Sequence, residues 1–133
     1  MGCNSHLTIE VQGQWAHETL RWDTWALDIP ESRDYKLYEA MAGARGEEEN
    51  AVVTPRGIPV DASDAVVYWA KRWEGDGHTH SWLYPAEFHE AMRRAEAQDG
   101  EVHKPWTAID KILLALETVY GIEHVRIIFF FDN

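Results

Sequence analysis

The chain has 133 residues, and its 23 acidic residues outnumber its 12 basic ones, which gives a formal net charge of -11. This length suits one compact domain, predicted to span residues 1–133. The negative charge argues against general nucleic-acid binding, which needs a positive field, but a few arginines can still form a local pocket for a small anion.

The first predicted element is a strand over residues 6–11, where Leu7 and Ile9 alternate with His6 and Thr8. Gln12-Gly13 favours the tight turn of a hairpin, with a return strand that carries Trp15 and His17. Residues 20–32 have no clear period and predict a loop or an edge strand.

A helix is predicted from Tyr35 to a C-cap at Gly43, followed by a long loop over residues 44–60. The next helix has Asp61 or Ser63 as its expected N-cap and runs to Trp73. Residues 75–84, with two glycines and two histidines, are expected to be largely irregular.

Pro85 suits the first turn of a helix that continues to Gly100, and Thr107 is the expected cap of a further helix that ends at Gly121. The final segment, residues 124–133, is apolar on both faces and predicts a central strand. The predicted fold class is α+β: a small, mostly antiparallel sheet, built from the N-terminal hairpin and the C-terminal central strand and packed with about three to five helices.

The single cysteine, Cys3, excludes an intrachain disulfide and is typical of a reducing cytoplasm. No apolar run approaches the length of a membrane span, and the start lacks the basic region of a secretory signal. Seven tryptophans exceed the needs of a core this small, so some rings are expected to line a groove or an interface between copies of a homo-oligomer.

A zinc site is one hypothesis, with Cys3, His6, His78 and His80 as candidate ligands. On an extended segment, His-x-His points both rings to one side. The alternative is that Cys3 is simply buried and that the histidines bond to loop backbone, because nothing local joins the two halves.

A histidine-based phosphodiesterase is another hypothesis, since His6-Leu7-Thr8 matches one His-x-Thr/Ser motif. The second copy is incomplete, because neither His78 nor His80 is followed two residues later by Thr or Ser. No residue is therefore assigned a catalytic role.

Capture of an anionic ligand has broader support in the sequence. Arginines beside irregular segments supply forked donors, neighbouring glycines let the backbone approach an anion, and aromatic rings can stack on a nucleobase. The predicted ligand-binding residues are His6, Arg33, Arg45, Arg56, Asp76, His78, His80, Ser81 and Trp82.

Five segments of the chain resemble, in order, a family of small phage and prophage proteins: MGCNSHLTIEV, RDYKLYEAMAGARG, PRGIPVDAS, KRWEGDGHTHSWL and HVRIIFFFDN. That family typically opens with Met-Gly-Cys-Asp-Ile-His and carries a His-Ser-His-Ser-Trp-Leu motif. This chain departs from it at Asn4, Ser5 and Thr79. The resemblance implies an accessory phage protein in the cytoplasm of an infected bacterium.

Residues and resemblance together lead to the hypothesis of a phage anti-defence protein that sequesters a nucleotide-derived immune signal, either a cyclic nucleotide or an ADP-ribose derivative. The first alternative is a metal-dependent or histidine-based phosphodiesterase or nuclease. The second is an acidic protein-binding module that acts on a host protein through residues such as Glu47, Glu48 and Glu49. The sequestration hypothesis requires the predicted residues to surround a common hollow.

Overall fold

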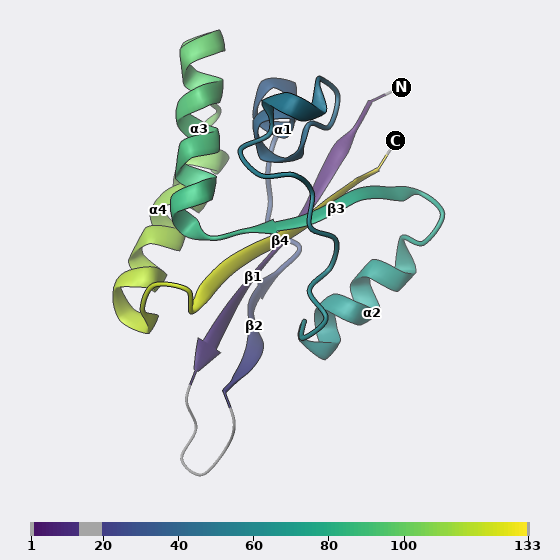
Figure 1. Cartoon of the computed structure of the whole chain (residues 1–133), viewed down its shortest axis with the longest axis vertical. Coiled ribbons are helices and arrows are strands. Elements are labelled where there is room, and N and C mark those ends of the chain that lie inside the picture. Colours follow the sequence, from purple (N-terminus) through teal and green to yellow (C-terminus); the bar gives the residue numbers. More distant parts are fainter. Residues whose placement is uncertain (1, 14–19, 133) are drawn as a thin grey trace.

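In the computed structural model, which describes residues 2–13 and 20–132, four antiparallel strands form one open sheet in the order β2-β1-β4-β3 (Figure 1). The strands are β1 (Asn4–Gly13), β2 (Arg21–Leu27), β3 (Gly77–Leu83) and β4 (Val125–Asp132). The helices are α1 (Tyr35–Ala42), α2 (Asp64–Arg72), α3 (Pro85–Asp99) and α4 (Lys104–Tyr120), with a short 3-10 helix, η1 (Glu48–Asn50). The predicted α+β fold is confirmed.

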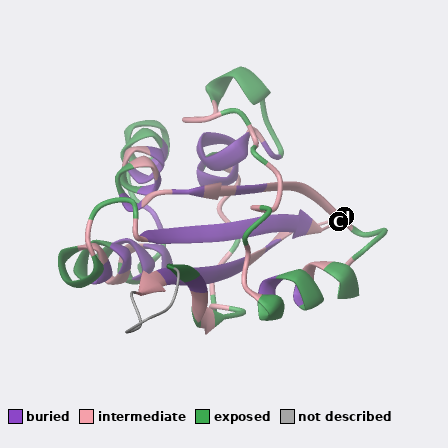
Figure 2. Ribbon diagram, turned by 60° about the horizontal axis from the view of Figure 1, so that its bottom comes forward, coloured by how far each residue is buried: buried purple, intermediate pink, exposed green. Residues whose placement is uncertain are grey.

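The two central strands are buried on both faces, as Figure 2 shows for the middle of the sheet. Leu7 and Ile9 of β1 belong to the main core, while Thr8 and Glu10, on the other face, are also fully buried. Every residue of β4 from Val125 to Phe131 is buried. The prediction of a central C-terminal strand is confirmed.

The main core lies between one face of the sheet and helices α1, α3 and α4. Helix α1 begins where the Asp34 side chain accepts the Leu37 amide and ends at Gly43, which has a φ of 78° that a side chain would oppose. Helix α4 starts at Lys104, so the prediction that Thr107 caps it is wrong: Pro105, whose fixed φ suits a first turn, allows the earlier start.

Helix α2 and the preceding segment, residues 51–63, cover part of the other face. We call this segment the strap. The Gly57 amide donates to the His80 carbonyl at 2.9 Å, and the Ser63 amide donates to Glu10 Oε2 at 2.7 Å. The strap, which includes the end of the long loop expected over residues 44–60, is therefore bonded to both β3 and β1.

The structure differs from the sequence-based prediction most clearly at β3. Gly77–Leu83 was expected to be irregular, but it pairs with β4, which offers a free edge to a segment about 50 residues away in sequence. Strand β2 confirms the edge strand expected within residues 20–32. The return strand expected at Trp15 and His17 falls outside the described residues. Within the described residues, no helix combines the length and apolarity needed to cross a membrane.

Candidate functional site

The predicted binding residues separate into two groups along the sheet. At the end where the termini lie, Asn4 pairs with Asp132, which in turn pairs with Gly77 (Figure 1). This end and the segments that contact it carry the first group: His6, Arg33, Arg45, Asp76, His78 and His80. The second group, Arg56, Ser81 and Trp82, lies further along β3 and on the strap. The nine residues therefore do not surround one hollow.

His6 is enclosed by other side chains rather than by open space. Its Nε2 lies 2.5 Å from Asp132 Oδ2, and its side chain is 12% exposed. Its ring stacks on Phe130 at 4.9 Å between centroids and lies 4.2 Å from the Trp73 ring. His6 thus joins β1, β4 and the end of α2.

His78 and His80 point to opposite faces of the sheet, contrary to the expectation for a regular extended segment. A bulge lies between His78 and Ser81, and Thr79 has a φ of 56°. The His78 ring lies near Phe131 on the main-core side, whereas His80 stacks on Phe130 on the α2 side at 5.0 Å. The Thr79 hydroxyl oxygen lies 2.8 Å from Nδ1 of His78, within hydrogen-bond distance.

Burial lowers the pKa of His80 below its ordinary value, and the neighbouring His78 lowers this pKa further. A histidine whose pKa is depressed on folding binds a proton more readily in the unfolded chain. We therefore expect the free energy of unfolding to decrease as the pH falls below about 6.5, the ordinary histidine value. Urea denaturation of wild type and His80→Gln between pH 7 and pH 5 tests this.

The variant is expected to have a flatter pH profile than wild type in this range. His103→Gln, at an exposed histidine next to α4, serves as the control and is expected to keep the wild-type slope. Equal slopes in wild type and His80→Gln would contradict the prediction.

The four candidate zinc ligands do not converge. Cys3 is fully buried in the main core, whereas His6 lies on the opposite face of the sheet, against Phe130. His78 and His80 diverge at the bulge. Across residues 2–13 and 20–132, no group of three or more His, Cys, Asp or Glu side chains is arranged to hold a metal ion.

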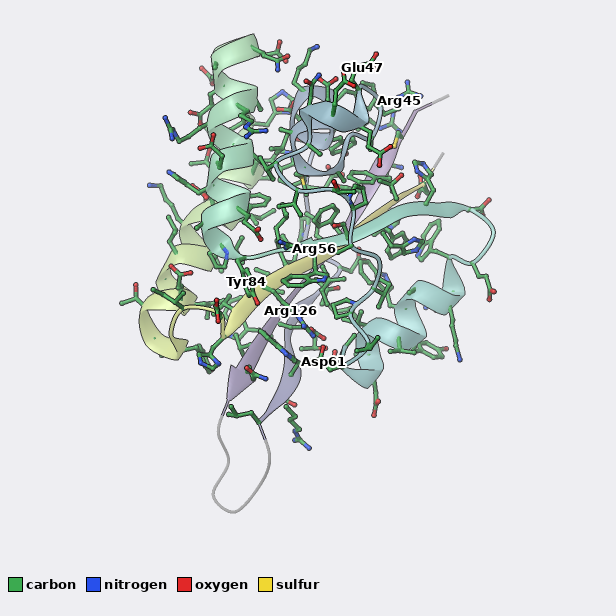
Figure 3. All side chains as sticks on the ribbon, in the orientation of Figure 1. Arg45, Glu47, Arg56, Asp61, Tyr84 and Arg126 are labelled. Carbon is green, nitrogen blue, oxygen red and sulfur yellow. The ribbon has the colours of Figure 1, made fainter. Side chains whose placement is uncertain are left out.

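Arg33 and Arg45 lie near the start of β1. Arg33 donates from Nε to Asn4 Oδ1 at 2.8 Å, and the Arg45 guanidinium lies 4.8 Å from the centre of the Tyr35 ring. The Tyr35 hydroxyl accepts the Cys3 amide at 3.2 Å. These two arginines therefore lie at the end of the sheet that carries the termini, away from Arg56. Figure 3 shows Arg45 and Arg56 well separated.

Two residues of the other group, Arg56 and Trp82, border a pocket of about 700 Å³, which we call the aromatic–guanidinium pocket. Its walls come from the ends of β1 and β3, the starts of β2 and β4, the strap and the turn before β4. The lining residues are Gln12, Trp22, Arg56, Ile58, Pro59, Val60, Asp61, Trp82, Tyr84, Glu123, His124 and Arg126. Figure 3 shows Arg56, Tyr84, Arg126 and Asp61 on this part of the molecule.

Guanidinium groups and aromatic rings alternate along this pocket. Arg126 lies 3.8 Å from the Trp22 ring centre and 5.7 Å from that of Trp82. Arg56 lies 4.2 Å from the Trp82 ring centre and 6.0 Å from that of Tyr84. Stacking of this kind holds the planar groups in fixed orientations and favours a rigid surface.

The Arg126 side chain is only 4% exposed and meets two carboxylates. Its Nε donates to Glu10 Oε1 at 2.8 Å, and Nη1 donates to Asp61 Oδ1 at 3.1 Å. Nη2 lies 2.7 Å from the same Glu10 oxygen, but not at an angle that makes a hydrogen bond. Among the described residues, Arg126 Nη2 is thus held in a close ion pair with Glu10, although it makes no hydrogen bond.

Arg56 is paired more completely. Its two terminal nitrogens donate to the two carboxylate oxygens of Glu87 at 2.8 and 2.7 Å. Burial raises the pKa of Glu87, but hydrogen bonds from Arg56 and the Tyr84 amide outweigh this effect and hold the pKa below its ordinary value. The Arg56 amide also donates to the buried Ser81 hydroxyl at 3.0 Å, so Ser81 anchors the strap.

Sequence reasoning missed most of this pocket, including Trp22, Tyr84 and Arg126. One signal was present for Arg126: a charged residue inside an otherwise apolar strand needs a partner in the fold. Nothing local in the sequence indicates that Glu10 is that partner, because 116 positions separate the two residues.

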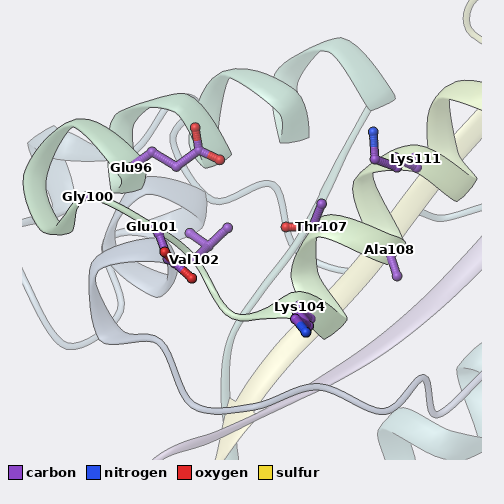
Figure 4. A pocket seen from close by; sticks show the side chains of 8 residues that line it. All are labelled: Glu96, Gly100, Glu101, Val102, Lys104, Thr107, Ala108 and Lys111. Atoms are coloured by element: carbon purple, nitrogen blue, oxygen red, sulfur yellow. The ribbon is translucent and has the colours of Figure 1, made fainter.

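A second pocket, of about 620 Å³, lies between the end of α3 and the start of α4 (Figure 4). It is lined by Glu96, Gly100, Glu101, Val102, Lys104, Thr107, Ala108 and Lys111. Its charges are mixed and its lining includes no aromatic ring, so it offers no surface on which a base can stack.

Comparisons with protein-family models, curated proteins and solved structures find no match.

Proposed function

We propose that this protein binds a small nucleotide-derived molecule in the aromatic–guanidinium pocket and sequesters it. The observation that carries the proposal is Arg126, which lines the pocket, lies 3.8 Å from the Trp22 ring centre and meets the exposed carboxylate of Asp61 through Nη1. A ligand oxygen that takes the place of this exposed carboxylate receives a charge-assisted hydrogen bond from the guanidinium. The Trp82 and Tyr84 rings offer faces for a base.

The charges around the pocket restrict the class of ligand. Glu87 already neutralises Arg56, and Glu10 and Asp61 already neutralise Arg126. Glu123 adds a further carboxylate to the lining. These charges disfavour a triphosphate more strongly than a ligand with one or two negative charges, such as a cyclic mononucleotide or an ADP-ribose derivative.

The resemblance to small phage proteins supports a role against host defence in the bacterial cytoplasm. A protein that acts by sequestration needs a well-formed pocket but no catalytic group. His6 does not line the aromatic–guanidinium pocket, and aromatic rings cover its imidazole.

The test is to incubate the purified protein with cyclic mononucleotides, cyclic dinucleotides and cyclic ADP-ribose isomers, and to measure the free ligand before and after heat release. We expect at least one ligand to be depleted and then recovered unchanged. Trp82→Ala is expected to weaken its binding by about 1–3 kcal/mol, or about 5- to 150-fold, because a stacking face is lost. Binding is measured by calorimetry on folded protein.

Trp25→Ala is the matched control, because Trp25 is 47% exposed on β2 and does not line the pocket. This variant is expected to bind as wild type does. Equal affinities in Trp82→Ala and wild type, or no depletion of any ligand, would contradict the proposal.

A histidine-based phosphodiesterase is the second candidate, favoured by the short His6–Asp132 contact. A carboxylate that holds an imidazole in one tautomer is a common feature of general-base histidines. Chromatography of the same ligands after incubation distinguishes the two: an altered product that disappears with His6→Ala but persists with His103→Ala supports the enzyme, and unchanged ligand supports sequestration.

A further inference from the structure

The two carboxylates on Arg126 are held in unequal ways. Glu10 is fully buried, and its second oxygen is fixed by the Ser63 amide at 2.7 Å. Asp61 is 59% exposed, and a single 3.1 Å contact joins its carboxylate to Nη1. Water therefore competes for Asp61 but not for Glu10, so Asp61 is the easier partner to replace.

Asp61 also has space to move into. It borders the aromatic–guanidinium pocket on one side and, on the other, a pocket of about 480 Å³ that lies beside β2 and the start of α2. The Ser63 amide holds the strap two residues further on, and the Ala62 amide closes a turn onto the Pro59 carbonyl. The Asp61 side chain can thus leave Arg126 without release of the strap.

We propose that Asp61 is an internal substitute for the ligand's anionic group, and that binding exchanges the Asp61 carboxylate for a phosphate or carboxylate oxygen on Arg126. This inference rests on the proposed function, and it defines the ligand as one that brings a single anionic group next to a planar ring. The exchange conserves charge on Arg126, because one anion replaces another. A neutral nucleoside gains only the ring contacts.

The exchange predicts an unusual effect of removing a charge. Asp61→Asn is expected to bind adenosine 5′-monophosphate about three- to fivefold more tightly than wild type, because an exposed ion pair of up to about 1 kcal/mol no longer competes. Its affinity for adenosine is expected to stay unchanged. Calorimetric titration of each probe into wild type and variant measures both affinities.

Glu123→Gln is the matched control, since it removes one negative charge from the same lining without an ion pair to Arg126. Its gain for adenosine 5′-monophosphate is expected to be smaller than that of Asp61→Asn. An equal gain in both variants means general electrostatics and overturns the inference. The inference is also overturned if Asp61→Asn binds adenosine 5′-monophosphate no more tightly than wild type. If Trp82→Ala still loses affinity in that case, the proposed function stands.

Binding of neither probe to any of these proteins, with no ligand depleted from the wider set, overturns the proposed function and the exchange together. Acetate and inorganic phosphate, as competitors of adenosine 5′-monophosphate in wild type, separate the two anion chemistries. Competition by phosphate alone assigns the site to phosphate esters, and competition by acetate alone assigns it to carboxylates. Competition by neither anion, while adenosine 5′-monophosphate still binds, counts against displacement of Asp61.

Discussion

Glu10→Ala is expected to lower the free energy of unfolding by about 3–5 kcal/mol, because it leaves the Arg126 guanidinium buried without its main counter-charge. The Arg126 side chain is 4% exposed and lies 3.8 and 5.7 Å from the ring centres of Trp22 and Trp82. The Ser63 amide, next to the first residue of α2, also loses its acceptor. Urea denaturation followed by tryptophan fluorescence measures the loss.

The double variant Glu10→Leu with Arg126→Met is the informative control. Replacement of both members of a buried pair by apolar side chains is often neutral, so this variant is expected to recover most of the stability. It is also expected to lose ligand binding, because Arg126 is gone. A loss below about 1 kcal/mol in Glu10→Ala would mean that solvent reaches the pair, contrary to its burial.

Phe130→Ala is expected to cost about 3–5 kcal/mol, the usual range for truncation of a fully buried phenylalanine. Its ring touches side chains from three elements: His6 of β1, His80 of β3 and Trp69 of α2, at 4.9, 5.0 and 4.8 Å between centroids. Its removal opens a cavity beneath α2, so protection of α2 amides against hydrogen exchange is expected to fall more than that of α4 amides.

Phe130→Leu keeps most of the apolar volume and is expected to cost clearly less than the alanine variant. Equal losses of protection in α2 and α4 would show that the second face is not a separate packing unit. The comparison also tests the role of the histidines, because His6 and His80 lose the same stacking partner.

These contacts differ from the ligand-binding role that the sequence predicts for His6 and His80. His80 packs against an aromatic core, where burial lowers its pKa, and His6 is fixed by Asp132. The proposed binding role passes instead to Arg126 and Trp82, with Asp61 as the replaceable partner. Of the nine residues expected to bind ligand, only Arg56 and Trp82 line the aromatic–guanidinium pocket.

The sequence by itself determined the local elements. Alternation over β1, the C-cap at Gly43 and the two-sided apolar strand at the end were all predicted, because each depends on neighbouring residues. The α+β class followed from their order. The start of α4 differs from the prediction, because Pro105 suits a first turn and the helix begins at Lys104, before Thr107.

Only the tertiary structure decided which side chains meet. Strand β3 exists because β4 offers it an edge, and the bulge at Thr79 then sends His78 and His80 to opposite faces. The pairing of Glu10 with Arg126 joins positions far apart in sequence. Such contacts depend on strand order and register. Burial of the whole sheet selects that order, and a short stretch of sequence contributes too little of this burial to identify its partner strand.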